Sequence, residues 1–396
     1  MKVDKTKWKY TRLDNLVHIL NGFAFKSDCY CQKGIRVIRI INVQDGYIED
    51  TDPKFYPVSY SNELSKYILH ENDLLISLTG NVGRVAFLPQ EMLPAALNQR
   101  VACIRSQNST TISLEFLYFF MMNKTFKDDC IKSSKGVAQL NMSTEWLKSY
   151  IIPIPPHIEQ QAIAAVLNTI QTMIDGYKAQ IADLDALAQS IFLDMFGNVS
   201  MNDKSWNIIP MGKLGDFKNG LNYNKGEQGK SIKIIGVGDF QNIKSLSSFN
   251  DISSIEVEHI SEEYLLHNED IVFVRSNGNK NLVGRCLEVY PNDAEVTFSG
   301  FCIRFRKSVE ISNKYLIALL TDSGFKKTHL LKSNGIGIQN INQKLLSSLP
   351  IPVPSADLQQ LFALKVETIE QQKEQLRLQL QDAETLMAER MQYYFS

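Results

Sequence analysis

The sequence predicts an α+β protein of two tandem-repeat globular domains, joined by a pair of long helices that pack as an antiparallel coiled coil with pseudo-two-fold symmetry. Three observations predict this. The 396-residue chain is too long for one ordinary core. Its second half repeats the first, and each repeat ends in a run of about 40 residues with an apolar heptad pattern. We therefore expect globular domains at 1–155 and 198–354, and long helices at 156–197 and 355–396.

The internal repeat is visible along the whole chain. Short motifs of the first half recur about 200 residues later, with one loop four residues longer in the second copy. The matching pairs are Trp8 and Gly22 with Trp206 and Gly220, Gly83-Arg84 with Gly284-Arg285, LNQRVACIR with FSGFCIRFR, and the terminal Met195-Phe196-Gly197 with Tyr394-Phe395-Ser396. Gene duplication is the plain interpretation, and it predicts one fold used twice.

The first part of each repeat mixes short β-like runs with turn residues. The runs are RVIRIINV, NDLLISL and VACIR in the first copy and IKIIGV, EDIVFVR and FCIRFR in the second. A shorter helix pattern follows in each, around Phe116 and Tyr315. Alternating prolines at 153 and 155, and again at 352 and 354, then force an extended lead-in to the long helix.

The long helices carry their apolar residues in steps of four and three, which is a heptad seam. Because a helix with one apolar stripe is not stable alone in water, the two helices should pack on each other. The expected packing residues are Ile163, Leu167, Ile170, Ile174, Ile181 and Leu184 in the first helix, and Phe362, Val366, Ile369, Leu376 and Leu380 in the second. The second seam is imperfect, since it also includes Lys373 and Arg390.

Composition and charge exclude several classes of protein. No apolar run reaches the ~18 residues of a membrane span. Six cysteines without regular spacing indicate reduced thiols in a cytoplasm, and Cys29-x-Cys31 is too short for a zinc site, so we expect no metal. Residues 1–156 carry a net charge of +4 and residues 197–356 of +2, whereas the helices carry −4 and −3. An anionic ligand is therefore more plausible on the globular parts, and a protein partner on the helices.

Catalytic motifs are missing. The Asp/Asn-Pro-Pro-aromatic tetrapeptide of an adenine methyltransferase is absent, because Pro155-Pro156 follows Ile154. NKGEQGKS, from Asn224, lacks the first glycine of a phosphate-binding loop and precedes a strand pattern rather than a helix. Asp52-Pro53-Lys54 is an acid-x-Lys triplet of a kind common by chance. The sequence gives no reason to expect an enzyme.

What remains is recognition chemistry in loops rich in Gly, Asn, Arg and Lys. Arg pairs bidentately with guanine and Asn or Gln with adenine, while Lys and Ser/Thr hold phosphates. The DNA-binding candidates are Lys26, Arg36, Thr79, Asn81, Arg84, Asn98, Gln99, Arg100, Lys135 and Gln139 in the first repeat, and Asn222, Lys225, Arg275, Asn277, Asn279, Lys280, Arg285, Lys332, Asn334 and Gln339 in the second. Asn98-Gln99-Arg100 corresponds to Ser299-Gly300-Phe301, which shares no polar reader. The alternative is that these loops are simple turns with solvated side chains.

Together these features resemble one family, the DNA specificity (S) subunits of type I restriction–modification systems. The resemblance rests on the tandem repeat, the junctions IIPIPPHIEQQAIA and LPIPVPSADLQQLFA, the loop SLTGNVGR and the closing SIFLDMFGN. It covers essentially the whole chain. The second junction departs from the pattern, with Ala356-Asp357-Leu358-Gln359 where the first has His157-Ile158-Glu159-Gln160.

The resemblance implies that 1–155 and 198–354 are target recognition domains, each reading half of a bipartite site on double-stranded DNA. The helices would fix the distance between half sites, and two modification (methyltransferase) subunits would dock on the chain, with restriction subunits adding cleavage. The chain itself would be a non-catalytic subunit without a cofactor, binding neither S-adenosylmethionine nor ATP. Two alternatives stay open at this point: a coiled-coil scaffold or interaction protein without sequence-specific DNA reading, and a self-contained nuclease.

Overall fold

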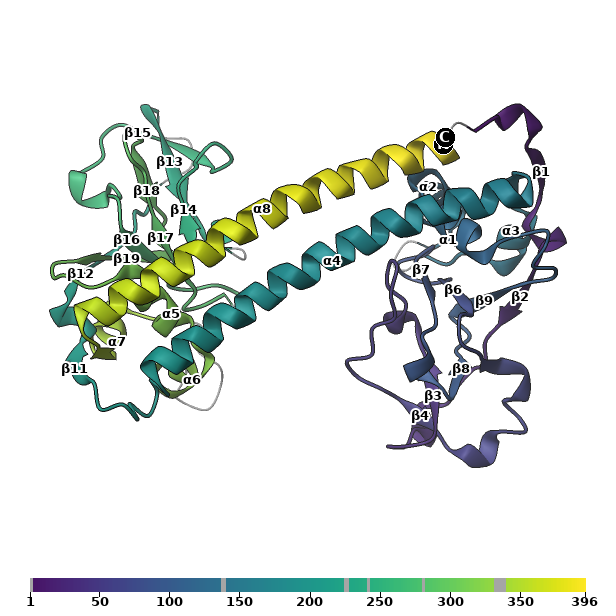
Figure 1. The fold of residues 1–396 in the computed structure, drawn as a ribbon, viewed down its shortest axis with the longest axis horizontal. Helices are drawn as coiled ribbons and strands as arrows, with labels where there is room; N and C mark the ends of the chain where they lie inside the picture. Colours follow the sequence, from purple (N-terminus) through teal and green to yellow (C-terminus); the bar gives the residue numbers. More distant parts are fainter. Residues whose placement is uncertain (1–2, 137–139, 224–227, 241–242, 280–281, 331–339) are drawn as a thin grey trace. The chain divides into compact units, whose positions relative to one another are not determined.

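The computed structural model describes residues 3–136, 140–223, 228–240, 243–279, 282–330 and 340–396. The chain forms two compact units, unit 1 (Met1–Lys178 with Leu378–Ser396) and unit 2 (Ala179–Arg377). Both long helices, α4 (His157–Phe196) and α8 (Ala356–Phe395), contribute residues to both units (Figure 1). Each differs by one residue at either end from the helix predicted at 156–197 or 355–396.

Unit 1 contains two four-stranded sheets and a two-stranded pair among its described residues. One sheet is antiparallel and has the strand order β2-β9-β6-β7. The other is built of shorter strands in the order β4-β3-β8-β5, with β3 and β8 parallel. The bounds are β1 Lys9–Arg12, β2 Val17–Asn21, β3 Ile35–Ile38, β4 Phe55–Tyr56, β5 Ile68–Leu69, β6 Leu74–Ser77, β7 Val85–Phe87, β8 Ala95–Leu97, β9 Val101–Ser106 and β10 Ile151–Ile154.

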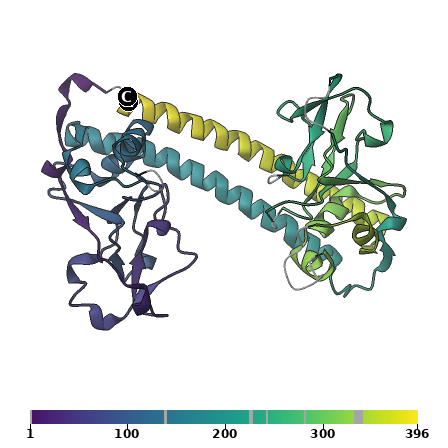
Figure 2. The same cartoon turned by 180° about the vertical axis from the view of Figure 1, so that it is seen from behind.

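Three helices cover the core of unit 1: α1 (Leu114–Met122), α2 (Lys124–Ser133) and α3 (Thr144–Ser149). The sequence predicted only the first, because α2 is polar and buries only Phe126 and Cys130. The N-terminal part of α4 and the last turns of α8 complete this core, and Figures 1 and 2 both show these segments side by side.

Unit 2 builds the same kind of core. A five-stranded sheet has the order β12-β19-β16-β17-β14, a three-stranded sheet the order β15-β13-β18, and β11 pairs with β20. The bounds are β11 Asn207–Pro210, β12 Gly215–Asn219, β13 Lys230–Ile235, β14 Ser245–Leu246, β15 Ser254–Val257, β16 Asp270–Val274, β17 Cys286–Val289, β18 Val296–Phe298, β19 Cys302–Lys307, β20 Pro350–Val353, α5 Asn313–Thr321, α6 Ser323–Phe325 and α7 Gln343–Ser347. The core includes the last turns of α4 and the first turns of α8.

The same ion pair, between a half-buried arginine and a buried aspartate, anchors the central strands of both units. Arg105 of β9 donates two hydrogen bonds, of 2.6 and 2.7 Å, to the carboxylate of Asp73, just before β6. In unit 2, Arg306 of β19 donates two hydrogen bonds of 2.7 and 2.8 Å to Asp270 of β16. Each carboxylate also accepts a backbone N–H at 2.7 Å, from His70 or His267. The hydrogen bonds to the carboxylates raise the pKa of both guanidinium groups.

The two proline junctions are extended, as predicted. β10 pairs antiparallel with β1 and β20 with β11, so each long helix leaves its unit from a short two-stranded pair. Immediately afterwards a buried glutamine joins helix and globular part. Gln160 accepts from the N–H of Ser113, the residue before α1, at 2.9 Å and donates to the carbonyl of Pro155 at 3.0 Å. Gln359 makes the matching contacts with Ser312 and Pro354, both at 2.9 Å.

Six of the predicted packing residues are buried, and Ile181, Leu184, Val366, Leu376 and Leu380 are half-buried. In unit 1, Ile170 and Ile174 of α4 pack with Ala383 of α8. In unit 2, the ring of Phe362 of α8 lies 5.2 Å from that of Phe196 of α4. Lys373 is also buried there, and its ammonium group contacts Asp185 at 2.7 Å and Glu370 at 2.9 Å.

All six cysteines are free thiols. Four are buried, and burial raises the pKa of Cys286 to about 11 and those of Cys130 and Cys302 to about 12, so these thiols are protonated and unreactive at neutral pH. Among the described residues, no helix combines the length and apolar character needed to span a bilayer.

Candidate nucleic-acid interface

Three loops meet at one end of the central sheet in each unit. In unit 1 the residues after β6 lie between the turn before β9 and the segment before α3: Leu78 donates to Arg100 (3.0 Å) and accepts from Met142 (2.8 Å) through the backbone. In unit 2 Arg275 takes the place of Leu78, donating to Phe301 and accepting from Ile341, both at 2.8 Å. The loops thus come together at the strand ends opposite the Asp–Arg anchor.

A fourth segment approaches this loop cluster through a glycine. Backbone hydrogen bonds of 2.8 Å join Phe23 to Leu97 and Leu221 to Phe298. A Cβ on Gly22 would lie 2.2 Å from the carbonyl of Asn98, and one on Gly220 would lie 2.0 Å from the carbonyl oxygen of Ser299. Only glycine permits this approach, which explains why the pair recurs in the sequence.

In unit 1 the cluster brings several predicted site residues together. Asn81, Gln99, Arg100 and Lys135 are exposed, whereas Thr79 is buried and pairs through its backbone with Asn141. Asn98 is half-buried, and its side-chain oxygen accepts from the N–H of Arg100 at 3.1 Å, so it shapes the turn that presents Gln99 and Arg100.

Other candidates of the first repeat are engaged elsewhere in the fold. Arg36 lies on β3, pairs with the buried carboxylate of Asp50 and covers the ring of Phe55 at 5.0 Å. Arg84 donates to the side chain of Gln44. Lys26 is exposed beyond the Gly22 segment, and Gln139 lies outside the described residues.

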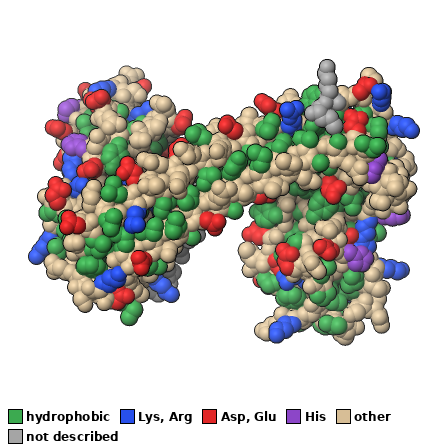
Figure 3. All heavy atoms as spheres, viewed as in Figure 1, with side chains coloured by type: hydrophobic (Ala, Val, Ile, Leu, Met, Phe, Trp, Pro, Cys, Tyr) green, Lys and Arg blue, Asp and Glu red, His purple; other side chains and the backbone are tan. Residues whose placement is uncertain are grey.

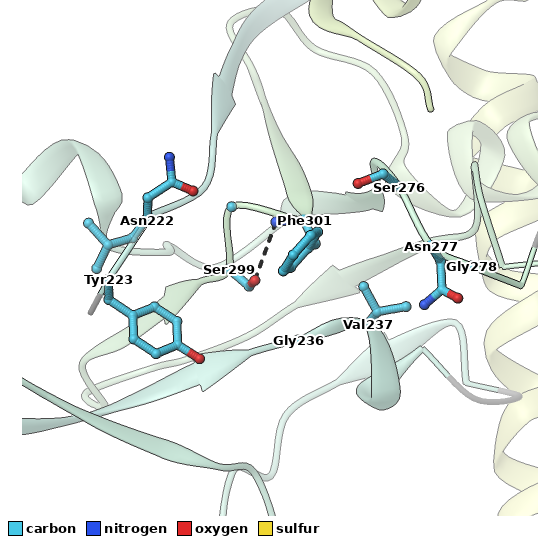
Figure 4. A pocket seen from close by; sticks show the side chains of 11 residues that line it. Asn222, Tyr223, Gly236, Val237, Ser276, Asn277, Gly278, Ser299 and Phe301 are labelled. Carbon is cyan, nitrogen blue, oxygen red and sulfur yellow. Dashed lines mark hydrogen bonds between the residues drawn. The ribbon is translucent and has the colours of Figure 1, made fainter. Parts of the chain in front are cut away.

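In unit 2 the loop cluster surrounds an open pocket of about 640 Å³ (Figure 4). Its walls combine amides, hydroxyls, glycine backbone, aromatic rings and the aliphatic side chains of Leu221 and Val237. The described lining residues are Leu221, Asn222, Tyr223, Gly236, Val237, Ser276, Asn277, Gly278, Ser299, Gly300 and Phe301.

Two predicted residues, Asn222 and Asn277, line this pocket, and Arg275 braces it. The guanidinium of Arg275 donates to the carbonyl of Gly300 at 3.4 Å. The side-chain oxygen of Asn277 accepts from the backbone N–H of Asn279 at 2.6 Å. Arg285 donates to the carbonyl of Phe240 at 3.2 Å, much as Arg84 is turned toward Gln44. The candidates Lys225, Lys280, Lys332, Asn334 and Gln339 lie outside the described residues.

Sequence reasoning missed Phe301 and Tyr223. Phe301 is 62% exposed and Tyr223 39% exposed, and both line the pocket. Polar side chains were the pattern expected of a DNA reader, and Ser299-Gly300-Phe301 shares no polar reader with Asn98-Gln99-Arg100. The sequence did contain a signal for Phe301. The internal repeat aligns Phe301 with Arg100, which was predicted to lie in a DNA-binding loop, and an aromatic residue in such a loop is expected to be exposed.

The described residues hold no group of three or more His, Cys, Asp or Glu side chains arranged for a metal ion. What the loop clusters offer is hydrogen-bonding amides and hydroxyls, exposed cations in unit 1 and exposed rings in unit 2. These are the groups that read base edges and hold phosphates.

Comparison with known proteins defines the class. A family model described as "Type I restriction modification DNA specificity domain" matches this chain twice, at residues 5–185 and 203–382. The chain belongs to this family of type I DNA specificity subunits, whose members are recognition subunits rather than enzymes. The match does not favour the coiled-coil scaffold without DNA reading.

Individual relatives agree over nearly the full length. The type I restriction enzyme StySPI specificity subunit of Salmonella potsdam is 25% identical, with the match covering 92% of this chain and 84% of that protein. The EcoBI specificity subunit of Escherichia coli is 23% identical, over 91% and 79%.

Solved structures show the same fold. The S subunit of a type I restriction–modification system from M. genitalium aligns with a TM-score of 0.59 at 16% identity, covering 100% of this chain and 98% of that one. A chain from a study of complex assembly and conformational transition of the type I R-M system aligns with a TM-score of 0.54 at 13% identity, covering 98% and 97%.

Proposed function

We propose that this chain reads a bipartite site on double-stranded DNA, one half with each loop cluster, and positions methyltransferase subunits on that site. Residues 1–155 and 198–354 are the two target recognition domains in this proposal. Each presents its loop cluster to one half site, with side chains that contact base edges and others that hold phosphates.

One observation carries the proposal: the two units repeat their scaffold but not their loops. Three features recur with matching contacts: the Asp–Arg anchor, the buried glutamine at the start of each long helix, which we call the Gln clamp, and the glycine that approaches the loop cluster. The Gln clamps are Gln160 and Gln359, and the glycines are Gly22 and Gly220. The loop side chains differ, with Arg100 in unit 1 where unit 2 has Phe301. Duplication with preserved framework and altered contact surface is expected of two readers with different targets.

In unit 1 the exposed side chains match sequence reading on a charged duplex. Arg100 suits the O6 and N7 acceptors of guanine, and Gln99 suits adenine. Lys135 and Lys26 suit phosphates. The candidate residues outside the described ranges stay predictions.

We further propose that α4 and α8 pack antiparallel as the spacer between the half sites. The contacts inside each unit support this, because the start of α4 meets the end of α8 in unit 1 and the end of α4 meets the start of α8 in unit 2. Inserting residues into α4 should then change the gap between half sites and leave both half sequences unchanged. Changed half-site bases with an unchanged gap would contradict the spacer.

Two modification subunits are the proposed protein partners, with restriction subunits adding cleavage. Exposed hydrophobic side chains on the helices support a docking role (Figure 3). They include Ile158, Leu187, Leu361, Leu364 and Leu378. The acidic character of the helices makes them unsuited to DNA and suited to a protein surface. We place the function in the cytoplasm, where bacterial genomic DNA lies.

The test is to sequence methylated genomic DNA from a host that expresses a type I methyltransferase subunit, with and without this gene. We expect a two-part adenine methylation motif that depends on the gene. Exchanging the unit 2 loops for those of a relative should change only one half of the motif. An unchanged methylation pattern after deletion of the gene would refute the proposal.

A further inference from the structure

We infer that Phe301 is a specificity-determining residue that makes the second unit read an A·T pair by contacting the C5-methyl group of thymine. The inference rests on the proposed function and adds the base-pair class that unit 2 selects. The observation behind it is an exposed aromatic ring: Phe301 is 62% exposed and lines the pocket of the loop cluster. Leaving a phenyl ring in water forgoes the free energy that its burial would contribute to folding.

The ring is held in this position by its backbone. The N–H of Phe301 donates to the hydroxyl of Ser299 at 3.3 Å, and its carbonyl accepts from Arg275 at 2.8 Å. The N–H of Cys302 donates to the carbonyl of Ser299 at 2.7 Å and closes the turn. The side chain of Arg275 adds a contact to Gly300. Four interactions in so short a turn indicate a fixed presentation of the ring.

The described residues that line the pocket beside the ring are uncharged, and they include both polar and apolar side chains. Figure 4 shows Phe301 between the Ser276–Gly278 loop and the side chains of Ser299 and Tyr223. Asn222 is packed so closely that a Cβ on Gly300 would lie 2.1 Å from its side-chain oxygen. None of the described lining residues is charged.

This combination selects one base pair. In the major groove thymine alone presents a methyl group, and its partner adenine presents the N7 and N6 groups that asparagine reads. A pocket that combines apolar side chains, among them Phe301, with the amides of Asn222 and Asn277 therefore complements an A·T pair. Guanine is best read by a cation, whereas the described residues that line the pocket are uncharged and the nearby guanidinium of Arg275 donates to the carbonyl of Gly300. An intercalating wedge projects from a surface, whereas Phe301 forms part of the wall of an open pocket.

Unit 1 supplies the contrast within the same molecule. Its equivalent turn presents Arg100, whose backbone carbonyl accepts from Leu78 as that of Phe301 accepts from Arg275. One backbone framework thus presents a guanidinium in one copy and a phenyl ring in the other. The two half sites should accordingly differ in base-pair class at this position.

The experiment uses the full chain in complex with its methyltransferase subunits and a duplex carrying the mapped site. Each thymine of the second half is replaced in turn by deoxyuridine, which lacks only the methyl group, and the dissociation constant is measured by fluorescence anisotropy. We expect one substitution to weaken binding about fourfold, the effect of losing one buried methyl contact. Phe301→Ala should abolish this sensitivity, and Phe301→Leu, which keeps an apolar side chain, should retain part of it.

The matched control is Arg100→Ala, which should leave the uracil effect in the second half intact. Three results would overturn the inference alone: a mapped second half without thymine, full affinity for every uracil duplex, or an undiminished uracil effect in Phe301→Ala. Tighter binding to mismatched duplexes without any uracil effect would assign the ring to base-step insertion and also overturn it. Absence of any methylated motif dependent on the gene would instead refute the proposed function.

Discussion

The turn before β9 and the turn before β19 are the most informative pair of regions in the molecule. In both turns a backbone N–H of the neighbouring loop donates to the turn. Both turns also lie so close to a glycine, Gly22 or Gly220, that a Cβ there would clash with the backbone of the turn. Yet one presents Gln99 and Arg100 and the other Gly300 and Phe301. Different residues therefore determine the backbone geometry and the side-chain chemistry of these turns. Backbone hydrogen bonds and the Asp–Arg ion pairs hold the framework, and the exposed residues on it can change without disturbing it.

This separation explains how duplication produces two specificities without two folds. The frame residues are buried and mutually hydrogen-bonded, so substitutions there cost stability. The turn residues face solvent and cost little when changed. The following predictions test first what the units share and then how they differ, from the largest expected effect to the smallest.

The Asp–Arg anchors should be the most sensitive shared feature. Arg105→Ala leaves the carboxylate of Asp73 buried without its partner, and Arg306→Ala does the same to Asp270, which is 1% exposed. We expect each substitution to lower the free energy of unfolding of its own unit by about 3 kcal/mol. Urea unfolding of the full chain, combined with hydrogen exchange to assign the affected unit, measures this.

Arg100→Ala serves as the control for the anchor variants, because it removes an exposed arginine of unit 1 without touching the pair. It should change unfolding by less than about 0.5 kcal/mol. A large loss for one anchor and none for the other would show that the frames are not equivalent.

Arg100 itself should matter for DNA rather than for stability. Its removal takes away a bidentate donor at the first half site, so we expect affinity to fall by about 1–3 kcal/mol and discrimination to relax at one guanine of that half. Binding measured on duplexes with each base varied shows which position is affected. Equal relaxation in both halves would contradict the assignment of one half to each unit.

Much of this framework could be predicted from the sequence, and the reasons are local. The heptad spacing fixed both long helices to within one residue, and alternating prolines identified the extended junctions. The repeat showed that the same fold occurs twice. Each of these signals lies in neighbouring residues or in a comparison of the chain with itself.

The side-chain partners could not be predicted, because they depend on tertiary contacts. Arginine is a residue type that reads DNA bases, but in this fold Arg36 pairs with Asp50 and Arg84 donates to Gln44. Phenylalanine is a typical core residue, but the turn leaves Phe301 exposed. The helix α2 lacked a signal because only two of its residues are buried.

The Gln clamps should affect geometry more than base reading. Gln160→Ala leaves the N–H of Ser113 and the carbonyl of Pro155 without this partner, at a cost of about 1–3 kcal/mol. We expect reduced methylation of the full bipartite site, while base preference within each half stays unchanged. The adjacent exposed Gln161→Ala is the matched control. Altered base preference in Gln160→Ala would instead place the clamp in the reading surface.

The smallest effect on stability is expected at Lys373, where the two helix seams differ. With the shift of 199 residues, Lys373 of α8 corresponds to Ile174 of α4, which is 4% exposed and packs against Ala383. Lys373→Ile replaces a buried ion pair by an apolar side chain, and its partner Asp185 is 51% exposed and stays solvated. We therefore expect the free energy of unfolding to change by no more than about 1 kcal/mol, with either sign allowed by the balance of desolvation and charge pairing.

The effect of Lys373→Ile on helix register should be larger than its effect on stability. A single buried polar contact favours the one alignment that satisfies it, whereas an all-apolar seam tolerates others. Methylation mapping should then show more than one gap length between the half sites in Lys373→Ile and a single gap in the wild type. Lys178→Ala is the control, because it removes an exposed pair with Glu384, the repeat counterpart of Asp185. A single unchanged gap in Lys373→Ile, together with a loss of several kcal/mol, would make Lys373 a stabilising residue and not a register-fixing one.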